Sequence, residues 1–229
     1  MKVTSTVDTW LRMAEISDAA LRERAWIEEY EAAFPTVFET YYRAWGRRDL
    51  IPEASRTAPE RIAEVEAADR RSRAVLARVE EEFRLLGLLN PADLLVGQHS
   101  SNGWVTMHEG RATLFLALEF LPDPPFDEIL IVHELSHVVQ GLLSGVALDG
   151  VMPVGEAVLT EGAAAAVSRF LRPGAPDSAY LWFDDAHQAW IEECARARTL
   201  VTGCAAAARR CAVLGQSQPS KRIRSHLRG

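Results

Sequence analysis

The segment His133-Glu134-Leu135-Ser136-His137 places two histidines four residues apart, with a glutamate directly after the first. On an α-helix, residues at this spacing differ by about 40° around the axis and by one turn in height, so both imidazoles can reach one ion. Zinc favours nitrogen ligands, and a catalytic zinc keeps one coordination position for a water molecule. Glu134 would lie beside that water and could take its proton. The HExxH segment therefore predicts Zn2+ bound by His133 and His137, with Glu134 as a general base rather than a ligand.

The helix that would carry these side chains is apolar on nearly all sides. Its aliphatic residues are Ile129, Leu130, Ile131, Val132, Leu135, Val138 and Val139. Such a helix is buried, and ionisable side chains in it are costly unless they share a partner such as a metal ion. Chance produces an HExxH in a chain of this length with odds on the order of one in a hundred. We therefore expect a zinc site, and keep a hydrogen-bonded cluster of core side chains as the alternative.

A third zinc ligand is expected on the following helix, in Thr160-Glu161-Gly162. Gly162 and the alanines after it would let two helices approach closely enough for a short carboxylate to meet the ion. Glu156 is the rival, but it lies about 140° around the same helix from Glu161, so both cannot face the metal. We predict that Glu161 completes the site and that Glu156 is a surface acid or an outer partner.

Together, HELSH and TEGAA resemble the gluzincin metallopeptidases, in which HExxH supplies two zinc ligands and a Glu-Gly or Glu-Ala on the next helix supplies the third. The closer resemblance is to a bacterial family of predicted zinc-dependent proteases that is catalogued as a domain of unknown function. In that family an Asn-Gly and a strand ending in Glu precede the motif. Asn102-Gly103-Trp104 and Leu114–Glu119 look like this upstream part.

The resemblance covers roughly residues 94–170 and implies a zincin-like pair of helices around the metal. The zinc ligands it implies are His133, His137 and Glu161, and the catalyst is Glu134. Ala165 stands where many gluzincins carry an acid that orients a ligand histidine, so another partner is required, and Asp149 is a candidate. The part of the chain after about Thr202 does not resemble the family.

Peptide hydrolysis also needs a hydrogen-bond donor for the oxyanion that forms at the substrate carbonyl. Tyr180 and His187 are the candidates for this catalytic role. His99 and His108 fall in predicted turns, and we expect both to face solvent.

The elements that must position these residues follow from hydrophobic spacing. From Asp8 to about Leu89 the pattern is helical, with breaks near Pro35 and Pro52. Three strands are then expected, at 93–97, 104–107 and 111–120. The last of these strands could pair with an extended substrate along its edge. Further helices are expected over 126–143, over 153–169 and from 177 onward.

The predicted fold class is therefore α+β and mostly helical, with a small sheet of about three strands and the active-site helix pair. An N-terminal helical lobe is expected over 1–90 and a catalytic core over 91–200. A basic tail over 201–229 has a composition compatible with disorder.

The chain of 229 residues carries 25 basic and 32 acidic side chains, and its basic residues after Cys204 lie in a stretch without acids. Because the rest is strongly negative, nucleic acid is not expected as a partner. The stretch 129–148 approaches membrane length, but the polar motif inside it favours a buried helix, so no membrane partner is expected. The first residues lack the apolar run of a secretory signal, and three clustered cysteines do not pair evenly, which favours the cytoplasm.

We expect a zinc metallopeptidase that hydrolyses a peptide or protein substrate through a zinc-activated water. The first alternative is a degenerate zinc- or peptide-binding regulatory module without turnover. The second is a helical interaction protein with a fortuitous HExxH. No pattern in the sequence indicates an oligomeric state.

Overall fold

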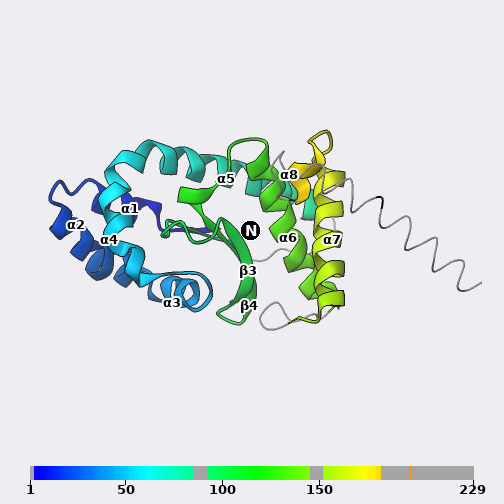
Figure 1. Ribbon diagram of the computed structural model, residues 1–229, viewed down its shortest axis with the longest axis horizontal. Coiled ribbons are helices and arrows are strands. Elements are labelled where there is room, and N and C mark those ends of the chain that lie inside the picture. Colours follow the sequence, from blue (N-terminus) through cyan, green and yellow to red (C-terminus); the bar gives the residue numbers. More distant parts are fainter. Residues whose placement is uncertain (1–2, 85–91, 145–151, 182–195, 197–229) are drawn as a thin grey trace, which may run out of the picture. The chain divides into compact units, whose positions relative to one another are not determined.

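The computed structural model describes residues 3–84, 92–144, 152–181 and 196. Nearly all of them belong to the first of two compact units, Met1–Tyr180 and Leu181–Gly229. Figure 1 shows helices on either side of a small sheet within the first unit, which confirms the predicted, mostly helical α+β class.

Before residue 85 the elements are β1 (Val3–Ser5), α1 (Val7–Ala14), α2 (Ala19–Ala25), η1 (Trp26–Glu31), α3 (Pro35–Ala44), η2 (Arg48–Leu50), α4 (Ile51–Thr57), η3 (Ala58–Arg61) and α5 (Ile62–Arg84). After residue 91 they are β2 (Ala92–Leu95), β3 (Gly103–His108), β4 (Arg111–Ala117), η4 (Leu118–Phe120), α6 (Phe126–Ser144), α7 (Val154–Leu171) and α8 (Asp177–Leu181).

The sheet has four described strands in the order β1-β2-β4-β3, one more than predicted. The additional strand is β1, which pairs in parallel with β2 so that Val3 lies opposite Ala92. Three residues are too few to show the alternation that marks a strand, so the sequence pattern missed it. Because β1 pairs with a strand that follows all the N-terminal helices, the segments predicted as lobe and core contribute to one sheet and one compact unit.

β4, which was predicted to offer an edge to substrate, lies inside the sheet between β2 and β3. Its residues from Ala112 to Ala117 are buried on both faces, so β4 belongs to the core and the edge prediction was wrong. The outer strand on this side of the described sheet is β3, which is antiparallel to β4. The predicted strand also ends early, because Leu118–Phe120 form the short helix η4.

Two of the N-terminal helices begin where the sequence indicates. Pro35 starts α3 and Pro52 lies in the first turn of α4, where the missing amide donor does no harm, so both predicted breaks are confirmed. Tyr30, in the π-helix η1, is fully buried. Its hydroxyl donates to the Val96 carbonyl at 2.8 Å and accepts from the Val96 N–H at 2.9 Å. This side chain ties the helices to the end of β2.

Helices α6 and α7 lie side by side (Figure 1), and α6 also contacts β3, β4 and α5. The observed bounds of α6 agree with the predicted 126–143, and six of the seven aliphatic residues expected to be buried are buried, whereas Val139 is half-buried. Arg172, directly after α7, holds the far end of this pair, because its guanidinium lies 2.8 Å from Glu128 of α6 and 2.9 Å from Glu82 of α5. None of the described helices has both the length and the apolar composition needed to span a membrane.

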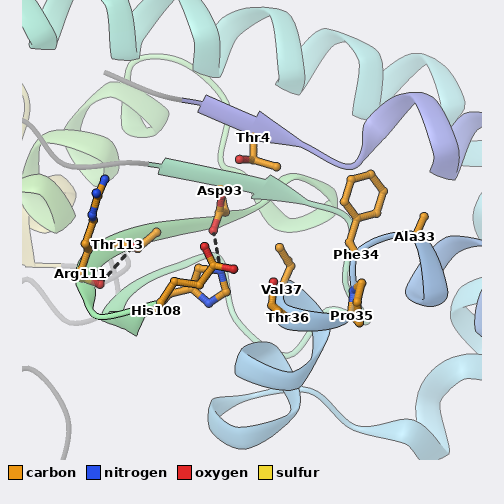
Figure 2. A pocket seen from close by; sticks show the side chains of 11 residues that line it. Thr4, Ala33, Phe34, Pro35, Thr36, Val37, Asp93, His108, Arg111 and Thr113 are labelled. Atoms are coloured by element: carbon orange, nitrogen blue, oxygen red, sulfur yellow. Dashed lines mark hydrogen bonds and ion pairs between the residues drawn. The ribbon is translucent and has the colours of Figure 1, made fainter.

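His108 was predicted to face solvent, but the structure shows that its side chain is largely buried. It is the last residue of β3, and 9% of its side chain is exposed. Its Nδ1 lies 2.9 Å from the Thr40 hydroxyl, and its Nε2 lies 3.6 Å from Asp93 in a polar pocket of about 430 Å³ (Figure 2). Residues at even spacing along a strand share a face, so His108 lies on the side of the sheet that buries Trp104. His99 is exposed, as predicted.

Candidate metal centre

α6 carries both histidines of the HExxH segment in a largely buried environment. Their side chains are 7% exposed for His133 and 12% exposed for His137. The spacing of one helical turn places the two rings edge to face, with 4.8 Å between their centroids. Two buried imidazoles at this distance need polar partners, because neither ring is surrounded by water.

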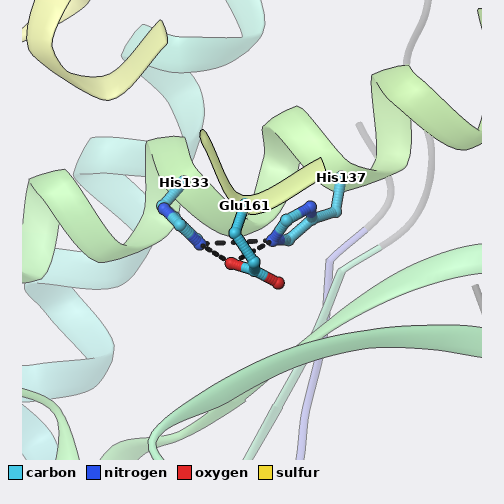
Figure 3. A group of neighbouring side chains, drawn as sticks. All are labelled: His133, His137 and Glu161. Atoms are coloured by element: carbon cyan, nitrogen blue, oxygen red, sulfur yellow. Dashed lines mark hydrogen bonds and ion pairs between the residues drawn. The ribbon is translucent and has the colours of Figure 1, made fainter. Parts of the chain in front are cut away.

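Glu161 of α7 supplies such a partner to both rings (Figure 3). Its Oε2 lies 3.1 Å from Nε2 of His133 and 3.5 Å from Nε2 of His137, and the two nitrogens are 3.2 Å apart. Within the described ranges, these three residues form the one group of His, Cys, Asp or Glu side chains that could hold a metal ion. Glu156, the rival ligand, is exposed and is not part of the group.

The three converging atoms fit the geometry of a zinc site. Zinc binds imidazole nitrogen and carboxylate oxygen at about 2.0–2.1 Å, so two ligand atoms at tetrahedral positions are about 3.3–3.4 Å apart. The separations of 3.1, 3.2 and 3.5 Å lie around this value. Two nitrogens and one oxygen are also atoms that zinc accepts, and three protein ligands leave the fourth position to water or substrate. The residues therefore fit a catalytic type of zinc site.

Glu134 lies next to this group but does not belong to it. It faces the first residue of β3, and a Cβ built on Gly103 would lie 3.4 Å from its Cγ. Burial raises the pKa of the Glu134 carboxyl, and the nearby His137 and His133 offset only part of that effect. A carboxyl with a raised pKa accepts a proton more readily near neutral pH, as a general base must.

The charges of the group stabilise one another. Hydrogen bonds from His133 and His137 hold the pKa of Glu161 well below its usual range, although partial burial opposes this. Burial lowers the pKa of His137, but its hydrogen bond with Glu161 and the charges of Glu134 and Glu161 outweigh burial and raise the pKa overall. The carboxylate of Glu161 is therefore ionised, as a metal ligand must be.

The two histidines differ in what holds their second nitrogen. Nδ1 of His137 lies 3.2 Å from Oε1 of Gln140, one turn further along α6. The Gln140 amide nitrogen donates in turn to the backbone carbonyl of Thr160 at 3.0 Å. Nδ1 of His133 is buried and has no hydrogen-bond partner among the described residues. Gln140 thus connects a predicted ligand on α6 to the residue before the predicted ligand on α7.

Tyr180, a predicted oxyanion donor, is not brought to the group. Its hydroxyl donates to the carbonyl of Arg172 and accepts from the N–H of Ala175 at 3.1 Å, so it closes the turn after α7. Arg172 follows Glu161 by eleven residues, which on a helix is about 16 Å along the axis. Tyr180 packs instead against Ile129, near the start of α6. That prediction was wrong because a turn closed by a buried tyrosine has no signal in hydrophobic spacing.

Two further predicted residues, His187 and Asp149, lie outside the described residues. Conversely, the sequence analysis gave no role to Gln140 and did not connect Gly103 with Glu134. The sequence held one indication of a role for Gln140, since it lies three residues after His137 and therefore on the same side of the helix.

Comparison of the chain with protein-family models, curated proteins and solved structures found no match.

Proposed function

We propose that this protein is a zinc-dependent metallopeptidase that holds its ion with His133, His137 and Glu161. The observation that carries the proposal is the convergence of two imidazole nitrogens and one carboxylate oxygen, from two helices, at separations of 3.1–3.5 Å. A hydrogen-bonded core cluster would also bring a carboxylate to two buried histidines, and the close approach of the two Nε2 atoms, 3.2 Å apart, is what favours a shared ion. The match to zinc rather than to a harder cation rests on the nitrogen-rich ligand set.

The reaction assigned to the site is hydrolysis of a peptide bond. When bound, zinc supplies Lewis acidity that makes a water molecule acidic near neutral pH. Glu134 is placed to accept the proton of the attacking water on its carboxylate and to donate it to the leaving amine. The partly desolvated position of Glu134 favours this transfer, because its carboxylate is poorly hydrated and its pKa is raised.

The second candidate is a zinc- or peptide-binding module without turnover. The observation that favours it is the placement of Tyr180, whose hydroxyl is bonded to the turn after α7 and so does not serve as an oxyanion donor. A site without such a donor loses a large share of its transition-state stabilisation, on the order of 100-fold or more in rate.

A hydrolysis assay separates the two candidates. The full chain, loaded with one equivalent of zinc, is incubated with a mixture of unstructured peptides, and new amino termini are quantified by mass spectrometry. Glu134→Gln is the matched control, because it keeps the size of the side chain and the three ligands but removes the base. Cleavage by the wild type that a chelator abolishes, that zinc restores and that Glu134→Gln lacks supports the peptidase. Bound zinc without cleavage in either protein supports the second candidate. Failure of the wild type to bind zinc refutes the metal site on which both candidate functions depend.

A further inference from the structure

We infer that Gln140 is a positioning residue that fixes the protonation form of His137 and locks α6 to α7 beside the metal ligands. The inference rests on the proposed zinc site and adds to it a side chain that the HExxH pattern does not contain. Its basis is the pair of hydrogen bonds from the Gln140 amide, one to Nδ1 of His137 at 3.2 Å and one to the carbonyl of Thr160 at 3.0 Å.

The bond to Thr160 fixes the orientation of the Gln140 amide, and this orientation decides which atom is the donor in the bond to His137. A backbone carbonyl only accepts hydrogen bonds, so the group of Gln140 that faces Thr160 must be the NH2, which only donates. The oxygen Oε1 must then face His137, and because this oxygen only accepts, Nδ1 of His137 must carry a proton. The orientation of the amide therefore follows from the chemistry of the carbonyl and not from the shape of the side chain.

A proton on Nδ1 prepares His137 for a metal. In the neutral imidazole, one nitrogen carries the proton and the other carries a lone pair, so Nε2 is the nitrogen with the lone pair. Nε2 is also the atom that lies 3.2 Å from Nε2 of His133 and 3.5 Å from Glu161. Gln140 thus selects the form of His137 that directs its lone pair at the ligand group.

The bond to Thr160 adds a geometric role. Thr160 directly precedes Glu161 on α7, so the same amide that orients one ligand of α6 also fixes the helix that carries the third ligand. His133 has no comparable partner for its Nδ1 among the described residues. Within that part of the chain, Gln140 is therefore the side chain through which one helix sets the position of both His137 and Glu161.

The test compares the zinc affinity of three variants with that of the wild-type full chain, by competition with a chromogenic chelator. Gln140→Leu removes both hydrogen bonds at similar volume, and we expect zinc affinity to fall about 10- to 100-fold, the usual effect of losing an outer partner of a metal-ligating histidine. Gln140→Glu keeps an acceptor for Nδ1 but loses the donor to the Thr160 carbonyl, so its zinc affinity should lie between those of the wild type and Gln140→Leu. Thr160→Val is the matched control, because the bond uses the Thr160 backbone carbonyl and the substitution leaves that carbonyl in place.

Two further readouts distinguish positioning from a merely structural role. Thermal unfolding of the metal-free proteins should show only a small decrease of the midpoint in Gln140→Leu, because α6 and α7 contact each other along many other residues. A large decrease would show that Gln140 acts on the stability of the fold rather than on the metal ligands. Nitrogen-15 NMR of the metal-free protein, at a pH high enough to make His137 neutral, should show the remaining proton on Nδ1 in the wild type and a mixture of the two neutral tautomers in Gln140→Leu. Wild-type zinc affinity in Gln140→Leu, or a neutral His137 with its proton on Nε2 in the wild type, would overturn the inference while leaving the proposed peptidase intact. Absence of zinc binding by the wild type would instead refute the proposed function.

Discussion

Gly103, the first residue of β3, lies directly against Glu134 on α6, and a Cβ added to Gly103 would come within 3.4 Å of the Glu134 Cγ and 3.3 Å of the Leu116 Cδ2. The distance to Leu116 is tighter than ordinary van der Waals contact, and the distance to Glu134 lies at its lower limit, so a larger side chain at residue 103 would crowd both neighbours. The Asn-Gly that the sequence analysis compared with a family feature thus has a physical role here. It lets a strand approach the proposed general base.

Gly103→Ala should therefore crowd Leu116 and Glu134 and shift Glu134 slightly, without touching the metal ligands. We expect peptide hydrolysis to fall roughly tenfold, because catalysis is sensitive to small misplacement of a reacting group, while zinc content stays at one equivalent. The measurement pairs a peptidase assay with elemental analysis. Gly155→Ala is the matched control, because a Cβ on Gly155 meets no described atom within 4 Å. Unchanged hydrolysis in Gly103→Ala would show that this contact does not position the base.

Glu161→Ala should lose bound zinc, because it removes one of three protein ligands. Glu156→Ala should keep zinc, because Glu156 is exposed and lies outside the ligand group. Elemental mass spectrometry of the two proteins, after removal of loosely bound metal, compares two glutamates on the same helix. Normal zinc content in Glu161→Ala together with loss in Glu156→Ala would reverse the assignment of the third ligand.

Tyr30→Phe should destabilise the fold by about 1–3 kcal/mol, the cost of leaving buried polar groups without partners. The hydroxyl of Tyr30 meets the Thr6 hydroxyl at 2.8 Å and both backbone groups of Val96, and all of these would remain buried. Urea unfolding followed by circular dichroism gives the change in free energy. Trp45→Phe, at a residue that is 49% exposed, should change it much less. Equal stability of Tyr30→Phe and the wild type would mean that this bond network does not hold the helices to the sheet.

Glu119 should make the stability of the fold depend on pH. Burial raises the pKa of its carboxyl, although the backbone N–H groups of Gly97 and His99 oppose the effect. Because the folded-state pKa lies above that of the unfolded chain, the stabilising contribution of the protonated form is complete at low pH. It is lost as pH rises through the raised pKa.

Glu119→Gln does not titrate, so its free energy of unfolding relative to the wild type should rise as the pH increases above about 4.3, the usual pKa of a glutamate. Urea unfolding at several pH values measures this difference, and Glu15→Gln, at an exposed position, serves as the control. A difference that stays constant over this range would show that Glu119 keeps the same protonation state in the folded and unfolded chains.

Local spacing in the sequence was enough to predict the two helices of the site and the proposed ligands on them. The four-residue interval between His133 and His137 placed both on one side of a helix, and hydrophobic spacing predicted α6 and α7 to within a few residues. Glu161 was selected over Glu156 on composition and helical angle, and the structure places Glu161 with the histidines. Each of these inferences uses only contacts within one helix or between two consecutive helices.

The relations between segments far apart in the chain follow from packing and could not be predicted from spacing. Packing paired β1 with β2, it placed β4 between β2 and β3, and it brought Gly103 to Glu134. It also joined Gln140 to Thr160 and bonded Tyr180 to the turn after α7. These contacts have no periodic signal, because they depend on how finished elements pack and on which polar group finds a partner once water is excluded. Periodicity thus identified the proposed ligands, and packing decided what surrounds them.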